Sequence, residues 1–350
     1  MNDLQLAPIP TDLPCAWGGP AGTGSIRVQP EDFQVTEIPL VTPDENGEHV
    51  WLYIRKRGTN TQWVARQLAR HACARLSRVS YAGLKDRHAL TEQWFSVHLP
   101  GKPGPDWQAL NNETLQVLDV RRHSRKLKRG TLLGNRFCIT VREVQADAGL
   151  MEQRLQAIQD GGMPNFFGSQ RFGREGDNLR QAARLLNQPK SRLPQHKRSL
   201  YLSAVRSALF NRVLAARMEQ RCWNTALPGE ALQLAGKSAC FVMQQPDHEL
   251  QQRLERNEVH PTGPLCGEGP VLPTGEAADY EQSVLRPWNN WVQGLKQFRL
   301  AAARRALRVH PGDLSWKIDA DGSCSMRFFL PAGSYATVLL REVLATREPK

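Results

Sequence analysis

Most of residues 25–145 alternate apolar and polar positions with the two-residue period of β-strands, after an irregular lead over residues 1–24. Residues 25–39 (SIRVQPEDFQVTEIP) alternate around a Pro-Glu-Asp turn, and residues 48–58 (EHVWLYIRKRG) predict a second strand. Two further strands are predicted at 115–123 and 135–144. Residues 59–76 instead carry apolar side chains at helical spacing behind a Thr or Asn cap, which predicts a helix.

From residue 147 the spacing becomes mostly helical, with interruptions rich in Gly and Pro. The segments that predict helices are 147–162, the end of 165–188, 198–221 and 289–310. The stretch from Pro261 to Gly275 predicts a loop. Strand character returns in a hairpin over 314–333, and a closing helix is predicted at 334–344.

Strands therefore dominate residues 25–145 and return at 313–331, with helices between them. This order predicts an α+β domain that is built from both ends of the chain and interrupted by a mostly helical insertion. We expect the composite domain to span residues 1–160 and 310–350, and the insertion to span 161–309.

The charge of the chain points to a polyanionic partner. Its 350 residues include 46 Lys and Arg against 34 Asp and Glu, a formal net charge of +12. Such an excess favours nucleic acid first and an anionic membrane second, and the alternative is a basic soluble protein with no such partner. Hydrophobic residues make up 40% of the chain, which supplies a core and argues against wholesale disorder.

The spacing of the cysteine and histidine residues limits which disulfides and metal sites the chain can form. The seven Cys form no C-x-x-C pair, and the nine His show no metal-binding spacing. We therefore expect no disulfide scaffold, no structural zinc site and a reducing, cytoplasmic environment. The N-terminal MNDLQLAPIPTDLP lacks the apolar region of a signal peptide, and no window approaches a membrane-spanning length.

Two basic clusters are candidates for contact with a phosphate backbone, although a solvated surface is the alternative for each. The first cluster contains Arg121, Arg122, Arg125, Lys126, Lys128 and Arg129. The second contains Arg171, Arg174, Arg180, Arg184, Lys190, Arg192, Lys197 and Arg198. Phe166, Phe167 and Phe172 accompany the second cluster, where they suit either stacking on unpaired bases or core packing.

The stretch YAGLKDRHALTEQ places one carboxylate, Asp86, between Lys85 and Arg87, ahead of the strand-like WFSVHL. Asp favours turns, so a solvated turn residue is the simplest interpretation. The flanking cations favour another, in which the carboxylate stays ionised and acts as a nucleophile at an electron-poor or anomeric carbon. No second carboxylate lies at a spacing useful for a metal site.

At these residues the chain resembles the TruD family of tRNA pseudouridine synthases. YAGLKDRHALTEQWFSV resembles the catalytic motif of the family. Four further blocks resemble its N-terminal motif, central strand, insertion start and C-terminal motif, namely GTGSIRVQPEDFQVTE, GNRFCITVRE, PNFFGSQRFG and FFLPAGSYATVLLRE. All five lie in the family's order over residues 22–342, nearly the whole chain.

The resemblance implies a pseudouridine synthase catalytic domain with a mixed, mainly antiparallel sheet, plus an inserted TruD-specific α/β domain. It also implies isomerisation of uridine to pseudouridine in tRNA, at uridine 13 of glutamate tRNA in bacterial members, without a cofactor or metal. The target base must leave its stack to be reached. Asp86 would then attack C1′ of the ribose or C6 of the uracil, and removal of the C2′ proton to give a glycal is equally open.

The resemblance assigns residues to the base pocket as well. It places Phe33, Asn135 and Tyr335 around the base, and Phe137 should share a strand face with Asn135. The Asn135 amide offers both a donor and an acceptor to uracil. Lys85 and Arg87 join the basic clusters as candidates for contact with the RNA backbone.

Two positions depart from the common pattern of the family. Lys is common where this chain has Arg27; both pair with Asp86, but an always-charged Arg is a doubtful proton donor. The last aromatic is often Phe, and here it is Tyr335. Its hydroxyl would hydrogen-bond the uracil or a water, or simply be tolerated at the pocket rim.

Two other functions compete with this interpretation. A non-catalytic RNA-binding protein or RNA chaperone on the same fold would not require Asp86 in an intact motif. A small-molecule glycosidase would require a second carboxylate roughly 5–9 Å from the first, and none is evident. We therefore expect a cytoplasmic, monomeric tRNA pseudouridine synthase.

Overall fold

The computed structural model describes Ile9, residues 12–189 and residues 191–349. The chain divides into two compact units. The sheet unit comprises Pro20–Gln153, Pro311–Gly333 and the described part of Val343–Lys350. The helical unit comprises the described part of Met1–Gly19, the described part of Arg154–His310, and Ser334–Glu342.

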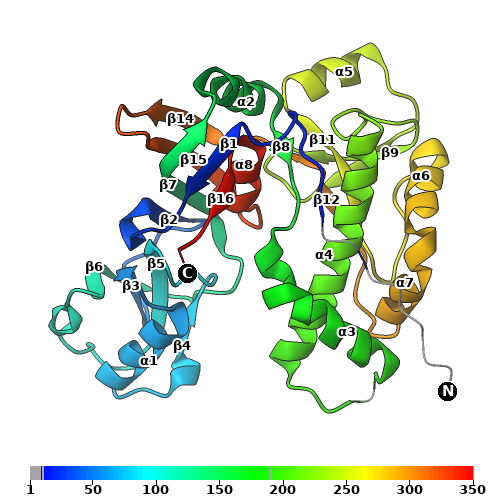
Figure 1. Cartoon of the computed structure of the whole chain (residues 1–350). Helices are drawn as coiled ribbons and strands as arrows, with labels where there is room; N and C mark the ends of the chain where they lie inside the picture. The colour runs from blue at the N-terminus through cyan, green and yellow to red at the C-terminus, as the bar shows by residue number, and fades with distance from the viewer. Residues whose placement is uncertain (1–8, 10–11, 190, 350) are drawn as a thin grey trace. The chain divides into compact units, whose positions relative to one another are not determined.

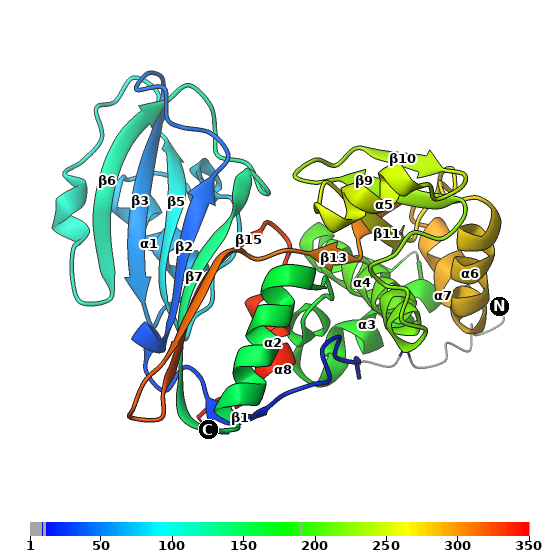
Figure 2. The same ribbon diagram turned by 90° about the horizontal axis from the view of Figure 1, so that it is seen from above.

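Within the described residues, the sheet unit is built on one ten-stranded sheet (Figure 1). Its strands are β1 (Gly22–Ser25), β2 (Phe33–Pro39), β3 (His49–Arg57), β4 (Val79–Tyr81), β5 (Leu90–His98), β6 (Leu115–His123), β7 (Leu132–Ala146), β14 (Gly312–Ile318), β15 (Cys324–Pro331) and β16 (Ala345–Arg347). Seven strands follow the order β14-β15-β7-β2-β5-β3-β6, and Figure 2 shows the part from β7 to β6 as neighbours. The remaining strands are attached at the side, with β1 paired to β7 and β16, and β4 paired to β5.

The directions of these strands confirm the predicted fold class. β2 and β5 run parallel, as do β1 and β16, whereas the other pairs of this sheet are antiparallel. The sheet is therefore mixed and mainly antiparallel, as the resemblance to the family implied. The Pro-Glu-Asp turn expected between strands is a short 3-10 turn, η1 (Pro30–Asp32).

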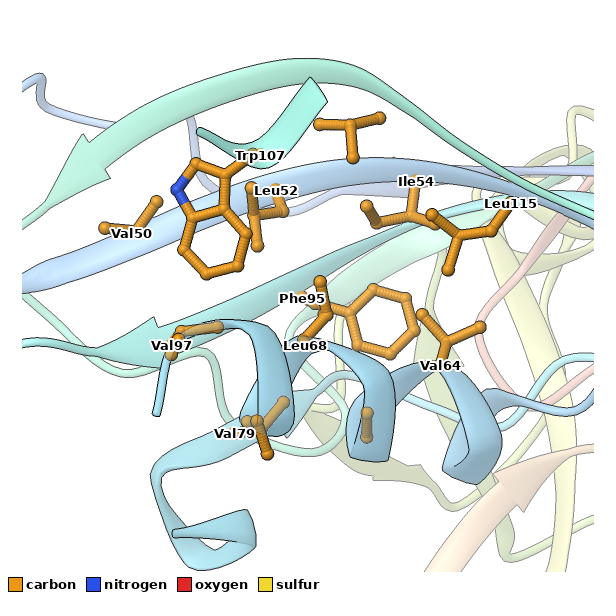
Figure 3. Packing of buried hydrophobic residues seen from close by; sticks show 14 of the residues in the cluster. Val50, Leu52, Ile54, Val64, Leu68, Val79, Phe95, Val97, Trp107 and Leu115 are labelled. Atoms are coloured by element: carbon orange, nitrogen blue, oxygen red, sulfur yellow. The ribbon is translucent and has the colours of Figure 1, made fainter. Parts of the chain in front are cut away.

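One face of the sheet unit is covered by α1 (Thr61–His71), as Figure 3 shows. Asn60 caps the helix by accepting a hydrogen bond from a backbone N–H of its first turn at 2.8 Å. Val64 and Leu68 face the sheet and pack in one buried cluster with Phe95 of β5. Full burial of a side chain such as Leu68 stabilises the fold by about 1.5–3 kcal/mol, so this cluster fixes the helix on the sheet.

The helical unit is dominated by helices of the middle of the chain. They are α3 (Asp177–Asn187), α4 (Gln195–Glu219), α5 (His248–Glu255), α6 (Gly275–Leu285) and α7 (Asn289–Lys296). Helices α2 (Ala148–Gly161) and α8 (Ala336–Val343) each carry residues of both units. The other 3-10 turns of the chain are η2 (Leu76–Arg78), η3 (Trp107–Leu110), η4 (Ser169–Phe172), η5 (Arg174–Gly176) and η6 (Arg286–Trp288).

Two small sheets also lie in the described part of the helical unit. In the larger, the strands follow the order β10 (Cys240–Met243), β9 (Glu230–Leu234), β11 (Val259–Leu265) and β12 (Ala303–Ala306). The smaller pairs β8 (Met163–Pro164) with β13 (Arg308–Val309). This mixture of helices and strands agrees with the α/β insertion that was expected.

Two sequence predictions are wrong in this unit. The helix predicted over 289–310 ends at Lys296, because Ala303–Ala306 pairs with β11 as a strand. The loop predicted from Pro261 begins inside β11 instead. The strand tolerates Pro261 because β11 changes partner there, from β9 to β12, so a proline without an N–H breaks no continuous ladder.

The division into units differs from the expected domains near both ends of the chain. The Trp17 indole donates to the Gly162 carbonyl at 2.9 Å, and Glu342 accepts from the Ala16 backbone N–H at 2.8 Å. These contacts join residues before Gly19 and Ser334–Glu342 to the helical unit. The boundaries at 1–160, 161–309 and 310–350 stay a prediction for the functional domains.

Candidate active site

Asp86 lies in the loop between β4 and β5, two antiparallel strands, so the strand-like segment expected after it is β5. Three buried polar side chains hold the backbone of this loop. Lys56 Nζ donates to the Asp86 carbonyl at 2.6 Å, and Thr61 Oγ1 accepts from the Lys85 N–H at 3.0 Å. Gln93 Nε2 donates to the Gly83 carbonyl at 3.0 Å. The loop is therefore fixed by β3, α1 and β5 rather than by its own sequence.

Lys56 is the most unusual of these three residues because its side chain is fully buried. Its ammonium also donates to the Thr59 carbonyl at 2.6 Å. Burial lowers the pKa of Lys56 to about 8, although the Asp86 carboxylate opposes this shift. Lys56 is thus a positioning residue. It holds the main chain of Asp86 and makes no hydrogen bond to the Asp86 carboxylate.

The Asp86 carboxylate has one cationic partner, Arg27, within the described residues. Arg27 Nη2 lies 2.7 Å from Asp86 Oδ2, and the His88 N–H donates to Asp86 Oδ1 at 3.0 Å. The Asp86 side chain remains 32% exposed, whereas that of Arg27 is 7% exposed. A fixed carboxylate with an accessible oxygen is the geometry that a nucleophile requires.

Arg27 is itself held tightly. Its Nη1 lies 2.5 Å from Glu348 Oε1, and its guanidinium lies 4.1 Å from the Phe33 ring centroid. Its backbone adopts φ of +57°, a left-handed conformation that is strained for a residue with a side chain. Strain of this kind persists where the surroundings over-determine a position, and here two carboxylates and an aromatic ring do so.

The predicted pocket aromatics form a stack next to this pair. The Phe33 and Phe137 ring centroids are 6.3 Å apart in an edge-to-face arrangement, and Phe137 stacks on Phe328 at 5.3 Å. Phe137 and Asn135 alternate in phase along β7, as expected for a shared face. Phe33 and Phe137 are largely buried, so they form a floor of packed rings rather than an exposed platform.

Lys85 is not placed as an RNA-backbone residue. Its side chain is 5% exposed, and its ammonium lies 2.7 Å from Glu37 Oε2 and 2.8 Å from Asn135 Oδ1. Glu37 and Asn135 are directly opposite each other on β2 and β7. The expected contact between Lys85 and phosphate is unsupported by this geometry, because the cation is buried and already bonded. Its neighbour Arg87 is exposed, as a phosphate contact requires.

Sequence reasoning missed Lys56 and Glu37, although the strand alternation carried a signal for both. Lys56 falls in phase with the buried Ile54 on β3, and Glu37 falls in phase with the buried Val35 on β2. A charged residue on the apolar face of a strand needs a buried partner. Glu348 carried no comparable signal because its contact with Arg27 joins positions 321 residues apart.

Tyr335 belongs to the helical unit, where its hydroxyl accepts a hydrogen bond from Arg171 Nε at 3.1 Å. Arg171 Nη1 donates to Ser203 Oγ, also at 3.1 Å, and among the described residues Arg171 has no acidic partner. The Tyr335 ring packs edge-to-face with Phe167 at 6.0 Å. Arg171 is therefore an uncompensated cation held by neutral groups, and the placement of Tyr335 beside the base stays a prediction.

The three Phe of the second cluster are buried, which favours the core alternative for each. Arg174 of this cluster has a fully accessible side chain. Lys190 lies outside the described residues.

The first basic cluster separates into two kinds of residue. Arg121 is paired with Asp119 and Glu45, and Arg122 donates to the carbonyls of Lys102 and Pro103. The following tip is anchored by the buried Leu127 and by a hydrogen bond from the Trp51 indole. Within the part of the chain that is described, the side chains of its exposed cations make no hydrogen bond or ion pair; these are Arg125, Lys126, Lys128 and Arg129.

No cluster of three or more His, Cys, Asp or Glu side chains among the described residues is arranged to hold a metal ion. None of the helices formed by those residues is long and apolar enough to cross a bilayer. The expectations of no cofactor, no metal and no membrane partner stay predictions.

Comparisons with known proteins identify relatives along nearly the whole chain. The family model described as tRNA pseudouridine synthase D (TruD) matches residues 15–189 and 177–343. Proteins named tRNA pseudouridine synthase D from Methylococcus capsulatus and Nitrosococcus oceani are 47% and 49% identical, each over 95% of this chain and 94% of the relative. A crystal structure assigned to tRNA pseudouridine synthase D of Methanosarcina mazei superposes with a TM-score of 0.71 at 21% identity. It covers 97% of this chain and 96% of the other, and it shows the shared fold.

Proposed function

The chain belongs to the TruD family of tRNA pseudouridine synthases, and from this premise we propose that it isomerises a uridine of tRNA to pseudouridine. The proposed substrate is uridine 13 of glutamate tRNA, and the enzyme acts as a cytoplasmic monomer without a cofactor or metal. The observation that carries the proposal is the environment of Asp86. Its partly exposed carboxylate pairs with Arg27, and the loop that contains it is held by a hydrogen bond from Lys56. Its position in the matching catalytic motif makes it the proposed nucleophile.

The reaction conserves composition, so it needs no co-reactant. The target uridine leaves its stack and enters the site. The N1–C1′ bond breaks, the uracil turns, and a C5–C1′ bond forms; C5 loses a proton and N1 carries one in the product. The ionised Asp86 serves in each of three routes: attack on C1′, attack on C6, or removal of the C2′ proton to give a glycal.

The floor of the proposed pocket is the ring pair of Phe33 and Phe137, and Asn135 reads the polar edge of the base. Packed rings exclude water, which keeps the detached uracil from escaping before it rejoins the sugar. Arg27 orients Asp86 and offsets its charge through the bond between Nη2 and Oδ2. Tyr335 is a further aromatic residue that is proposed to contact the target base.

The proposed contacts with the tRNA backbone are four exposed cations and one half-buried cation. The exposed ones are Arg87, Arg125, Lys126 and Arg174, and the half-buried one is Arg171, which has no acidic partner among the described residues. Each phosphate that such a residue neutralises releases counterions, so binding should weaken steeply with salt. Lys85, Arg121 and Arg122 are not carried forward, because carboxylates neutralise Lys85 and Arg121, and backbone carbonyls hold the Arg122 guanidinium.

Pseudouridine mapping on tRNA tests the proposal. The purified full chain should convert uridine 13 of glutamate tRNA, and a transcript with cytidine at that position should give no pseudouridine. Asp86→Asn keeps the size of the side chain but loses the anion, so turnover should disappear while tRNA affinity changes little. Activity of Asp86→Asn within a few-fold of wild type would refute the nucleophile. If the chain were an RNA-binding protein without catalysis, neither the wild-type protein nor Asp86→Asn would convert the uridine.

A further inference from the structure

We propose that Lys85 fixes the orientation of the Asn135 amide and thereby makes the site select uracil over cytosine. This inference rests on the proposed function, in which Asn135 meets the polar edge of the target base. It assigns Lys85 a role in specificity in place of the phosphate contact that the sequence suggested. Lys85 acts through Asn135 and is therefore a positioning residue.

The geometry around the amide supports this assignment. Lys85 Nζ lies 2.8 Å from Asn135 Oδ1, and a Lys ammonium has donors only. The amide atom that faces it must therefore be the oxygen. Asn135 is half-buried, and its Nδ2 has no partner among the residues that the structure describes. The amide nitrogen is thus available to a ligand.

Glu37 holds the lysine in this position. The Lys85 and Glu37 side chains are 5% and 1% exposed, and their charged atoms lie 2.7 Å apart. The other Glu37 oxygen accepts from the Trp94 backbone N–H at 3.2 Å. Because Glu37 and Asn135 are cross-strand neighbours, one ammonium bridges both. A buried ion pair of this kind does not turn easily, so the amide has one orientation.

A fixed amide distinguishes two bases that a rotating amide would accept equally. Uracil presents a donor at N3 and an acceptor at O4, whereas neutral cytosine presents an acceptor at N3 and a donor at N4. A free Asn side chain serves either base by turning through half a circle. With Oδ1 fixed beside Lys85, its second lone pair accepts from uracil N3–H while Nδ2 donates to a carbonyl. Cytosine would then place its N3 acceptor against the Oδ1 acceptor and its N4 donor against the Nδ2 donor.

The same pair of contacts suits the rotation that the reaction demands. To bring C5 to the place of N1, the detached uracil turns about the axis through N3 and C6. This turn leaves N3–H in place and exchanges O2 with O4. Asn135 therefore keeps an N3–H donor and a carbonyl acceptor before and after the turn, without reorienting.

Binding measurements on paired tRNAs test the inference separately from catalysis. The uridine that the wild-type enzyme converts is mapped first, so a failure of the proposed function appears at this step. Two transcripts that differ only in uridine or cytidine at that site are then bound to the Asp86→Asn chain. A bidentate base contact should give a preference for uridine of about five-fold or more.

The preference should depend on the donor-only partner of Asn135. Lys85→Met combined with Glu37→Gln avoids an orphaned charge and should reduce the preference to nearly one, mainly by improving the cytidine transcript. Lys85→Arg retains donors only and should keep the preference. A purely structural role would weaken both transcripts equally in the double variant, and an unchanged preference there would overturn the inference.

Modified bases probe the unaltered pair of Lys85 and Asn135 even if the double variant does not fold. A 3-methyluridine at the target removes N3–H and should bind about as weakly as cytidine, in the same Asp86→Asn background. Binding of 3-methyluridine as tight as that of uridine would overturn the inference, because Asn135 Oδ1 would then not accept from N3.

Discussion

The guanidinium of Arg27 bridges two carboxylates, with Nη2 at 2.7 Å from Asp86 Oδ2 and Nη1 at 2.5 Å from Glu348 Oε1. The Asp86 contact spans 59 positions of the chain and the Glu348 contact spans 321. The proposed nucleophile is therefore oriented by an arginine that the C-terminal segment holds in turn.

Arg27→Met should lower kcat strongly, because it removes the charge-assisted hydrogen bond to Asp86. Such a bond is worth about 1.5–3 kcal/mol, which corresponds to roughly 10- to 100-fold in rate. Arg27→Lys should lose less, since an ammonium can still reach one carboxylate. Steady-state kinetics on tRNA measure both effects.

Glu348→Gln is the matched control for Arg27. It removes the second carboxylate and leaves the Asp86 pair intact, so kcat should stay close to the wild-type value. If Arg27→Met turned over within two-fold of wild type, Arg27 would have no part in orienting Asp86.

Lys56 should give the protein a distinctive pH dependence of stability. Burial lowers its pKa to about 8 from an ordinary value of 10.5. Between these two pKa values, Lys56 therefore holds more protons in the unfolded chain than in the folded chain. The free energy of unfolding consequently increases as pH rises through this window, and the increase is lost as pH falls through it. The rise due to Lys56 should reach up to about 3 kcal/mol.

Chemical denaturation of wild type and Lys56→Met between pH 7.5 and 10.5 isolates this contribution. The difference between the two proteins should change with pH in the predicted direction. The exposed Lys126→Met is the matched control, and its difference from wild type should stay flat. A flat difference for Lys56→Met as well would mean that Lys56 titrates normally in the folded protein.

Local patterns predicted much of this fold, and long-range contacts explain where they failed. The alternation in 33–39 and 49–57 placed two strands, and it also held the signal for the buried Glu37 and Lys56. The Ala- and Arg-rich segment after Lys296 has high helical propensity, yet pairing with β11 makes Ala303–Ala306 a strand. Tertiary pairing of this kind is invisible to a local period.

The candidate site shows the same division. Asp86 was singled out by its flanking cations and by the family motif, whereas Phe33, Asn135 and Phe137 were assigned to the pocket through the resemblance to the family. The sequence could not predict that Lys85 is buried and bonded to Glu37 and Asn135. Lys85 and Arg87 flank Asp86 in the same way, and only the packing of the fold buries one of them. Lys85 is 5% exposed in its side chain, whereas Arg87 lies at the surface.

The first basic cluster should contribute to tRNA binding through its tip alone. Arg125→Gln/Lys126→Gln should weaken binding and reduce the salt slope by about two units if both residues contact phosphates. Arg121→Gln/Arg122→Gln is the matched pair, and it should leave the slope nearly unchanged because these side chains bind Asp119, Glu45 and backbone carbonyls. Equal changes in slope for both pairs, from binding curves at several salt concentrations, would contradict this division.

Tyr335→Phe tests why this chain carries a hydroxyl where Phe is common. The Tyr335 hydroxyl accepts from Arg171 Nε at 3.1 Å, so the change frees one donor of a proposed phosphate contact. We expect the Kd for tRNA to rise by roughly two- to ten-fold, the equivalent of about one neutral hydrogen bond. The ring still packs on Phe167, so kcat should stay near wild type.

The Arg171→Gln variant shows whether the Tyr335 hydroxyl acts through Arg171 or takes part directly in the reaction. It should weaken tRNA binding more than Tyr335→Phe does and should reduce the salt slope by about one unit. In the Arg171→Gln background, Tyr335→Phe should have little further effect, because the hydroxyl has lost the cation that it orients. Ser203→Ala, which removes the other hydroxyl partner of Arg171, should resemble Tyr335→Phe. A hundred-fold loss of kcat in Tyr335→Phe with unchanged Kd would instead place the hydroxyl in the chemistry of the base.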